Sequence, residues 1–374
     1  MIVSVLGANS LLAQYLIRYI QRLHNSSWKI YIWSYSIPFH PRISGITIYP
    51  LKQFVGLERL YNAVKYADIV FNLHEAQDLT LLPDKKQLEV HNVNFVRSLL
   101  SCARCPLVHL SSIFLQCSSY WPNVYESENE AEKYTVQWPF PSYCLSKWEA
   151  EQIIANSSVD AYIIRCVPVY GEGDTHSILT DLIKYAKNGN ITSLGDGEGV
   201  LQMAYAENIV VGLWSAVKKL LPYADPQSGT SKDIVNSPAR KRHIIRETII
   251  LADETPKKNV ITLFKPLLAN GKRFVAPSRI PFLTFCYFYY MVLAILNLLS
   301  KVLYIPRFIR TLPHPSVLYL YFYHWTFFNT NKSRLLLNYI PKIGYEESLN
   351  RCRMYYNRLV SEDIRTYSWN PYVS

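Results

Sequence analysis

The sequence predicts a doubly wound α/β fold, in which helices cover both faces of a parallel β-sheet. Short apolar runs alternate with longer helical stretches along the first half of the chain, which is the pattern of parallel strands joined by right-handed crossovers. The expected strands cover residues 1–6, 30–33, 46–49, 68–73, 107–111 and 161–165. The expected helices cover residues 12–23, 57–66, 87–103, 142–155, 178–188 and 209–221.

The first strand and helix follow from their hydrophobic periods. Residues 1–6 are almost wholly apolar, with no basic region before them and no cleavage-site pattern after them, so we expect a buried strand and not a signal peptide. Leu12, Leu16, Tyr19 and Leu23 then recur at helical spacing. The apolar run and the helical spacing together predict a strand, a tight turn and a helix at the start of the sheet.

Composition and charge limit the class of protein. The chain has 374 residues, of which 49% are hydrophobic, so a large core is expected and global disorder is excluded. The formal charge of +11 is compatible with an anionic partner. The sequence contains no zinc-finger spacing and no RNA-recognition signature, so we expect no nucleic acid partner and no metal site. Residues 240–243 form a dense basic run, which is either a solvated loop or a contact to acidic lipid headgroups. The seven cysteines are scattered, which fits a reducing compartment.

Residues 280–300 contain no charged side chain and lie between Arg279 and Lys301. This length can span about 30 Å of hydrocarbon as a helix, and its Tyr and Phe residues suit an interfacial position equally well. A buried core helix is the alternative. We expect a membrane-associated segment over about residues 280–304, with membrane lipid as a partner.

The turn after the first strand reads Gly7-Ala-Asn-Ser10-Leu-Leu-Ala13. A dinucleotide-binding turn takes glycine first for the tight turn, glycine second for close approach of the pyrophosphate, and a small third residue for helix packing. Gly7 and Ala13 comply, whereas Ser10 replaces the central glycine and offers a hydroxyl to a phosphate. The second strand ends at Ser34, where an acidic residue would bind the ribose, so the choice between NAD and NADP stays open.

Tyr143 and Lys147 form the candidate catalytic pair. Their spacing of four puts both side chains on one helix face. A neighbouring ammonium is expected to favour the phenolate and lower the pKa of the phenol, so that Tyr143 can act as a general base. Tyr61 and Lys65 have the same spacing, but only Tyr143 lies downstream of a strand that ends in a hydroxyl, Ser112. Ser112 is placed to hold a substrate oxygen.

Several motifs together resemble the extended short-chain dehydrogenases, and within them the 3β-hydroxysteroid dehydrogenase/isomerase family. The similar segments are Ser142-Tyr-Cys-Leu-Ser-Lys-Trp-Glu-Ala-Glu-Gln152, His91-Asn-Val-Asn-Phe-Val-Arg-Ser-Leu-Leu100, Arg165-Cys-Val-Pro-Val-Tyr-Gly-Glu-Gly-Asp174, Ala204-Tyr-Ala-Glu-Asn-Ile209, Leu251-Ala-Asp-Glu-Thr-Pro256 and Asn338-Tyr-Ile-Pro-Lys-Ile343. The resemblance implies oxidation of the 3β-hydroxyl of a steroid or sterol with NAD or NADP, with or without isomerisation. It also implies an endoplasmic-reticulum or mitochondrial membrane, a cytosol-facing catalytic domain and, as one arrangement, a homodimer.

The resemblance assigns roles to numbered positions. Tyr143 is the general base, Ser112 binds the reacting oxygen, and Lys147 tunes Tyr143 and holds the nicotinamide ribose. The implied cofactor-binding positions are Gly7, Ser10, Leu11, Leu12, Ser34, Leu73, Lys147 and Val167. The implied organisation is a dinucleotide-binding domain over residues 1–175 and a mixed substrate-binding region over residues 176–374, some elements of which return to the sheet.

Four positions depart from the family pattern. Ser10 and Ser34 are described above, His74-Glu75 stands where small residues lie beside the cofactor, and Cys166 replaces a proline. Two alternatives therefore accompany the main hypothesis. One is a decarboxylating sterol-4α-carboxylate 3-dehydrogenase. The other is a catalytically silent, membrane-bound nucleotide-binding scaffold.

Overall fold

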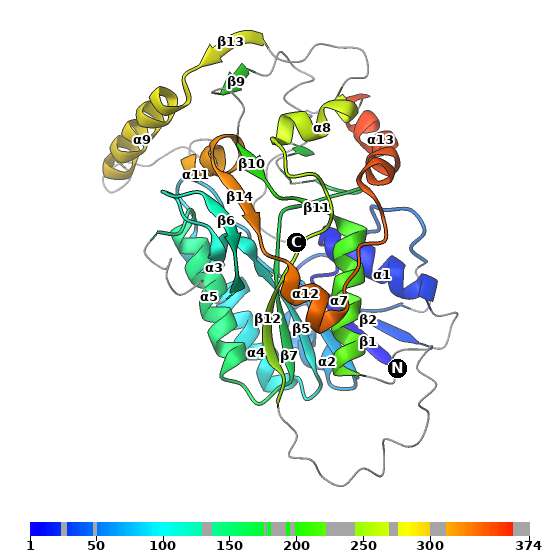
Figure 1. Cartoon of the computed structure of the whole chain (residues 1–374). Helices are drawn as coiled ribbons and strands as arrows, with labels where there is room; N and C mark the ends of the chain where they lie inside the picture. The colour runs from blue at the N-terminus through cyan, green and yellow to red at the C-terminus, as the bar shows by residue number, and fades with distance from the viewer. Residues whose placement is uncertain are drawn as a thin grey trace.

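The computed structural model describes residues 1–23, 28–47, 51–128, 137–175, 177, 179–180, 192–194, 199–221, 244–268, 276–299 and 312–361. At its centre lies a seven-stranded sheet whose paired strands all run parallel (Figure 1). The spatial order is β3 (Leu51–Val55), β2 (Lys29–Ser34), β1 (Ile2–Leu6), β4 (Ile69–Asn72), β5 (Leu107–Ser112), β7 (Ala161–Cys166) and β12 (Arg246–Leu251). The strand order reverses between β1 and β4, and ligands bind beside such a switch point in doubly wound sheets.

Both faces of the sheet are buried. In β4, Ile69 and Phe71 pack into one hydrophobic core and Val70 packs into the other, because successive side chains of a strand point to opposite faces. The helices α1 (Leu11–Leu23) and α7 (Ala206–Leu220) cover one face, and the helices α2 (Leu60–Val64), α4 (Phe95–Cys102) and α5 (Pro141–Ala155) cover the other (Figure 1). The predicted doubly wound fold is confirmed.

The third strand of the sheet is not where the sequence predicted it. The prediction of a strand over residues 46–49 is wrong for residues 46–47, which lie outside any strand, and residues 48–49 lie outside the described part of the chain; β3 begins at Leu51. β3 is an edge strand with Lys52 and Gln53 exposed, so its sequence is less apolar than the run before it. Most of the helix expected over residues 178–188 lies outside the described residues.

The crossover from β4 to β5 is a helix interrupted by a π-helical turn. It consists of α3 (Lys85–Leu88), a π-helical segment (Glu89–Asn94) and α4. Asp84 caps its start by accepting hydrogen bonds from the backbone N–H groups of Lys86 (3.0 Å) and Gln87 (3.2 Å). Single π-turns often occur at functional sites, and this one carries His91 and Asn92.

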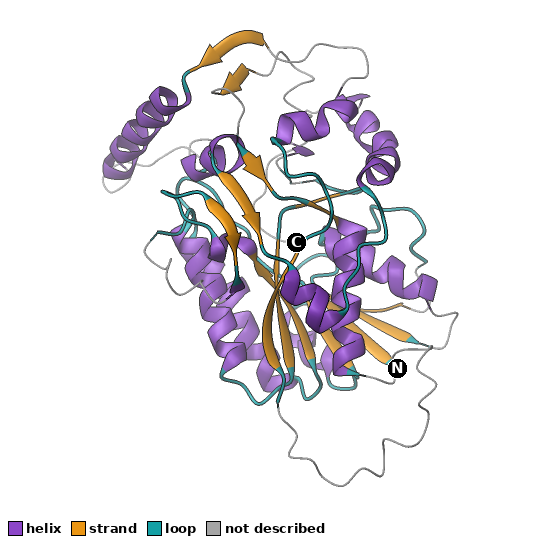
Figure 2. Cartoon of the chain, viewed as in Figure 1, coloured by secondary structure: helices purple, strands orange, loops and turns teal. Residues whose placement is uncertain are grey.

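Most of the remaining elements lie over the carboxyl ends of the central strands, whereas α12 (Asn331–Leu337) packs beside the sheet against α7 and β12 (Figures 1 and 2). They include a three-stranded sheet of β10 (Val200–Leu201), β14 (Trp325–Phe328) and β6 (Asn123–Glu126). Two short pairs join β8 (Val169–Tyr170) to β11 (Ala204–Tyr205) and β9 (Thr192–Leu194) to β13 (Ala276–Ile280). The helices are α8 (Val260–Leu268), α9 (Phe282–Leu299), α11 (Pro315–Leu318), α12 (Asn331–Leu337) and α13 (Tyr345–Ser361). The assignment of two domains divided at residue 175 stays a prediction, although β12 shows that a segment beyond residue 175 completes the central sheet.

The charge-free segment forms α9, whose 18 residues have a mean hydropathy of 1.9. Only Phe282, Cys286 and Leu293 are buried among its side chains, so α9 is not a core helix. Many of its other apolar side chains are exposed, among them Tyr287, which is 77% exposed. The helix is long and apolar enough to cross a membrane, and membrane contact stays a prediction.

Candidate active site

The turn between β1 and α1 needs glycine at Gly7. Its φ is +75°, and an added Cβ would lie 2.7 Å from backbone atoms of His74. The N–H groups of Gly7 and Ala8 both donate to the carbonyl oxygen of Trp33, each at 3.0 Å, which ties the turn to the end of β2. This close approach brings the turn, β2 and the end of β4 together at the switch point.

The turn ends at the N-terminus of α1. The Ser10 hydroxyl accepts a hydrogen bond from the backbone N–H of Ala13 at 3.2 Å, as an N-cap does. The amides of Leu11 and Leu12 belong to the first helical turn, where N–H groups have no partner within the helix and attract anions. Three of the predicted cofactor positions therefore lie where a pyrophosphate would bind, and the Ser10 hydroxyl can still donate its own proton.

The other predicted cofactor positions lie at the same edge of the sheet. Ser34 is the last residue of β2, Leu73 directly follows β4, and Val167 directly follows β7. All three are buried, and the Ser34 hydroxyl accepts a hydrogen bond from the Asn9 amide at 3.4 Å. The structure thus brings together positions that lie far apart in the sequence.

Aromatic rings fill the space beside the ends of β2 and β4. The rings of Tyr35 and His74 are parallel within 6°, with centroids 5.6 Å apart, and the His91 ring lies 4.3 Å from Tyr35. The two imidazoles are joined by a 3.0 Å hydrogen bond, and His74 also contacts Trp33 and Phe95 edge-on. The sequence marked His74 as unusual but gave no sign that it would join a ring cluster.

Ser112, Tyr143 and Lys147 come together at the carboxyl end of β5, beside α5. Tyr143 and Lys147 lie one turn apart on the buried side of α5, and each is only 1% exposed. Ser112, the last residue of β5, lies beside the phenol of Tyr143 and lowers its pKa. The ammonium of Lys147 donates to the carbonyl oxygen of Leu110 at 2.8 Å.

Glu75 joins this set. One of its carboxylate oxygens accepts a hydrogen bond from the Tyr143 hydroxyl at 3.0 Å and forms an ion pair with the Lys147 ammonium, also at 3.0 Å. Asn92 fixes the neighbouring residue, Ala76, by accepting from its N–H (2.8 Å) and donating to its carbonyl (3.0 Å). The sequence marks Glu75 as a departure but does not predict this contact, although a carboxylate three residues after the end of β4 was the available signal.

The carboxylate changes the protonation of the catalytic phenol. Burial, and then the negative charge of Glu75, raise the pKa of Tyr143 well above its ordinary value, while the nearby Ser112 hydroxyl lowers it. The expectation that Lys147 would lower this pKa is therefore wrong for the present arrangement. The first reason is that the phenol is buried, and the second is that the Glu75 carboxylate pairs with the ammonium and itself faces the phenol.

A buried ion pair supports α5 one turn further along. The guanidinium of Arg165 on β7 donates to Glu151 on α5 at 3.0 Å from Nε and 2.5 Å from Nη2. The Ser111 hydroxyl donates to the same carboxylate at 2.5 Å. These contacts tie α5 to β5 and β7, so they fix the register of Tyr143 and Lys147 against the sheet.

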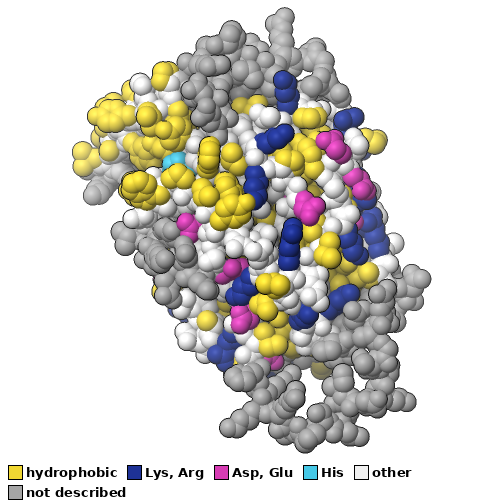
Figure 3. Space-filling view, viewed as in Figure 1, with side chains coloured by type: hydrophobic (Ala, Val, Ile, Leu, Met, Phe, Trp, Pro, Cys, Tyr) yellow, Lys and Arg dark blue, Asp and Glu magenta, His cyan; other side chains and the backbone are white. Residues whose placement is uncertain are grey.

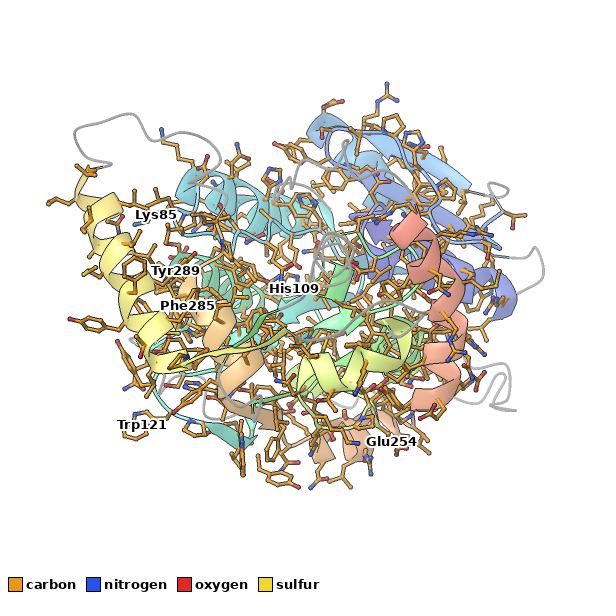
Figure 4. The ribbon with its side chains drawn as sticks, turned by 90° about the horizontal axis from the view of Figure 1, so that it is seen from above. Lys85, His109, Trp121, Glu254, Phe285 and Tyr289 are labelled. Carbon is orange, nitrogen blue, oxygen red and sulfur yellow. The ribbon has the colours of Figure 1, made fainter. Side chains whose placement is uncertain are left out.

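A cavity of about 330 Å³ opens on the outer side of Tyr143. It is lined by Asp78, Thr80, Leu81, Leu82, Pro83, Lys85, Phe140, Pro141, Ser142, Tyr143, Asn297 and His314. Asn297 belongs to α9, and Figure 4 shows Phe285 and Tyr289 of the same helix on its side toward the body of the molecule. The volume lies near the lower end of the range for small-molecule pockets, about 300–1,000 Å³. A second hollow, of about 370 Å³ between Glu128 and α12, contains none of the predicted site residues.

Residues 3–226 match the model of the NAD dependent epimerase/dehydratase family. The chain belongs to this family. The family uses NAD, and its members are oxidoreductases and epimerases of the extended short-chain dehydrogenase type. A comparison with curated protein sequences found no match.

Solved structures with the same fold include several epimerases. UDP-glucuronic acid 4-epimerase from Bacillus cereus, in complex with UDP-glucuronic acid and NAD, is 16% identical, with a TM-score of 0.65 over 96% of this chain and 100% of that chain. Epimerase Mth375 from Methanothermobacter thermautotrophicus is 17% identical, with a TM-score of 0.63 over 96% and 94% of the two chains. MoeE5 in complex with UDP-glucuronic acid and NAD is 14% identical, with a TM-score of 0.61 over 96% and 99%. At this identity the likeness shows the fold alone; the UDP-glucuronic acid 4-epimerase and MoeE5 structures hold a nucleotide sugar and NAD.

The groove defined by the predicted cofactor positions, from the glycine turn to Tyr143, fits the pyrophosphate of NAD and neither of its two ends. The turn at Gly7 and the amides of Leu11 and Leu12 suit a pyrophosphate. The nicotinamide-ribose end does not fit as it stands, because Lys147 is already bound to Glu75 and is closed to solvent. At the adenosine end, the buried His74 ring occupies space that the family pattern leaves to small residues.

Proposed function

We propose that this chain is a membrane-associated oxidoreductase that oxidises the 3β-hydroxyl of a steroid or sterol with NAD. The observation that carries the proposal is the Ser112–Tyr143 hydroxyl pair beside a cavity whose wall includes Asn297 of the exposed apolar helix α9. Membership of an NAD-dependent family supports the cofactor, and the resemblance of the sequence to steroid dehydrogenases supports the substrate.

The roles of the residues follow from their positions. Ser112 and Tyr143 would hold the alcohol oxygen between their hydroxyl groups, and Tyr143 would take up its proton. Lys147 would supply a positive charge next to the phenol once Glu75 has left it. NAD, when bound, supplies a hydride acceptor.

The surroundings of the cavity favour an apolar substrate. Leu81, Leu82, Pro83 and Phe140 form much of its wall. Figure 3 shows hydrophobic side chains gathered over α9, which forms one side of this region. The ring of Tyr323 stacks on Phe282 at 4.6 Å and is itself 45% exposed, so the apolar surface continues beyond the helix. A substrate dissolved in lipid would reach the cavity along this surface.

The same surface supports membrane association. Among the exposed apolar side chains of α9 are Leu283, Tyr287, Phe288, Ile295 and Leu298, and monomeric soluble proteins rarely expose so continuous a patch. We extend the proposal to an endoplasmic-reticulum or mitochondrial membrane with the catalytic domain on the cytosolic side. Replacing Leu283, Phe288 and Leu298 by serine should abolish co-flotation with liposomes, while the same change at the exposed Leu335 of α12 should not.

The decisive test of the activity uses detergent-solubilised full-length chain. Matched 3β- and 3α-hydroxysteroids, a 4α-carboxysterol and UDP-glucuronic acid are each incubated with NAD⁺ and the products are identified by mass spectrometry. We expect 3-ketosteroid from the 3β-epimer, loss of this product in Tyr143→Phe, and no loss in Tyr61→Phe, which changes the exposed tyrosine of the other Tyr–Lys pair.

Other products would redirect the proposal. Release of carbon dioxide from the 4α-carboxysterol would identify the decarboxylating dehydrogenase, and epimerised UDP-sugar would identify a nucleotide-sugar enzyme like the structural neighbours. Full turnover of the 3β-epimer by Tyr143→Phe would refute the role of Tyr143.

A further inference from the structure

We propose that His74 and Glu75 form an internal plug of the cofactor groove, and that the Glu75 carboxylate occupies the place at Lys147 where the nicotinamide ribose binds. The proposal rests on the proposed function, since it assumes that the groove receives NAD. It follows from the mismatch between this groove and the cofactor of its family.

The two plug residues fill the groove in opposite directions. Glu75 points to the catalytic pair and contacts both the Tyr143 hydroxyl and the Lys147 ammonium at 3.0 Å. His74 points to the adenosine side, where its ring lies parallel to Tyr35 and bonds to His91 at 3.0 Å. One dipeptide therefore closes both ends of the groove.

The backbone on either side of the plug is held in place. The N–H of Leu73 donates to the carbonyl of Leu6 at 3.1 Å, and that of His74 donates to the Asn72 side chain at 3.3 Å. Beyond the plug, Asn92 binds Ala76 on both backbone atoms and also donates to the Ser146 hydroxyl at 2.8 Å. Because both flanks are fixed, opening requires rotation of the two side chains and not movement of the loop.

Glu75 has a route out of the groove. Its side chain is 20% exposed, whereas that of Lys147 is 1% exposed. A rotation toward solvent would free the ammonium, and the hydroxyls of a ribose could then accept the hydrogen bond that the carboxylate accepts now. Cofactor binding is thus a competition between a tethered carboxylate and a ribose for one ammonium.

The competition predicts that removal of the carboxylate tightens NADH binding. We would titrate the detergent-solubilised chain with NADH and follow energy transfer from its tryptophans, comparing wild type with Glu75→Ala and Glu75→Gln. Glu254→Ala serves as the control, because Glu254 is an exposed glutamate that Figure 4 places at the edge of the molecule, away from α9 and from His109. The Glu75 variants should bind about tenfold more tightly than wild type, and the control should be unchanged.

A second readout identifies the place of the carboxylate. Added acetate should weaken NADH binding to Glu75→Ala by occupying the vacated position at Lys147, and should leave wild type and Glu254→Ala unaffected. Glu75→Gln keeps the volume and a hydrogen-bonding group, so it serves if the alanine variant folds poorly.

The outcomes separate the plug from the proposed function. If wild type binds NADH and neither Glu75 variant binds it more tightly, the plug is refuted and the proposed function stands. If the Glu75 variants bind more tightly but no variant oxidises a steroid, the plug stands and the steroid is wrong. If no folded variant binds NADH, both are refuted.

Discussion

Glu151→Ala would remove the counter-ion of an almost completely buried guanidinium. The side chains of Arg165 and Glu151 are 5% and 4% exposed, and the pair is joined by two hydrogen bonds. Breaking one side of a buried ion pair costs about 3–5 kcal/mol, because the remaining charge is left without compensation. In a chain of this size about 1 kcal/mol corresponds to roughly 2 °C in Tm, so the expected loss is about 6–10 °C.

The measurement is thermal unfolding followed by tryptophan fluorescence. Glu247→Ala is the matched control, since Glu247 pairs with Lys332 at 2.9 Å, but the two side chains are 47% and 28% exposed. An exposed pair contributes at most about 1 kcal/mol, so this control should lose about 2 °C or less. The double variant Glu151→Leu/Arg165→Met should recover most of the loss, because it leaves no buried charge. Equal losses in Glu151→Ala and Glu247→Ala would show that burial does not decide the strength of the pair.

Three further predictions use other features of the site. Gly7→Ala should lower the free energy of unfolding by about 2 kcal/mol or more, because φ is +75° and the new Cβ would meet backbone atoms at 2.7 Å. The control Gly344→Ala, whose new Cβ would meet no atom within 4 Å, should change Tm little. Equal Tm values for the two variants would contradict this reasoning. Burial lowers the pKa of His314 from 6.5 to about 4, so the unfolded chain binds a proton here at higher pH than the folded chain does. The free energy of unfolding should therefore fall by about 2 kcal/mol as the pH is lowered from 7 to 5. His314→Asn should lose this part of the pH dependence in Tm measurements, and an unchanged dependence would exclude it as the source. Glu75→Gln removes a charge that raises the pKa of Tyr143 before NAD binds. The rising limb of the pH profile of kcat/KM for NAD⁺, which reports the chain without NAD, should therefore move to lower pH, and a profile like that of wild type would refute this coupling.

The fold could be predicted because its signals are local. The alternation of apolar strands and helices is set by residues close in sequence, and the strand-to-helix turn at Gly7 depends on one backbone angle that glycine adopts easily. The prediction of the third strand failed because β3 lies at an edge of the sheet and its outward side chains, Lys52 and Gln53, remove the apolar pattern.

The sequence predicted which residues form the catalytic set, but not the contact of Glu75 with two of them. Tyr143 and Lys147 come from one helix, so their spacing is sufficient to place them on one face. Glu75 is 68 residues from Tyr143, and the contact between them depends on how the ends of β4 and α5 meet in three dimensions. The presence of a carboxylate was visible in the sequence, whereas its orientation toward the ammonium was not.

The position of β12 also affects how the chain must be synthesised. This strand, Arg246–Leu251, pairs with β7 along its whole length and follows the segment that matches the family. Until the ribosome has released these residues, β7 presents an unpaired edge that is open to pairing with another nascent chain. We therefore expect the growing polypeptide to be prone to pairing with other chains until β12 has been made. A fragment ending at residue 245 would be expected to aggregate rather than fold.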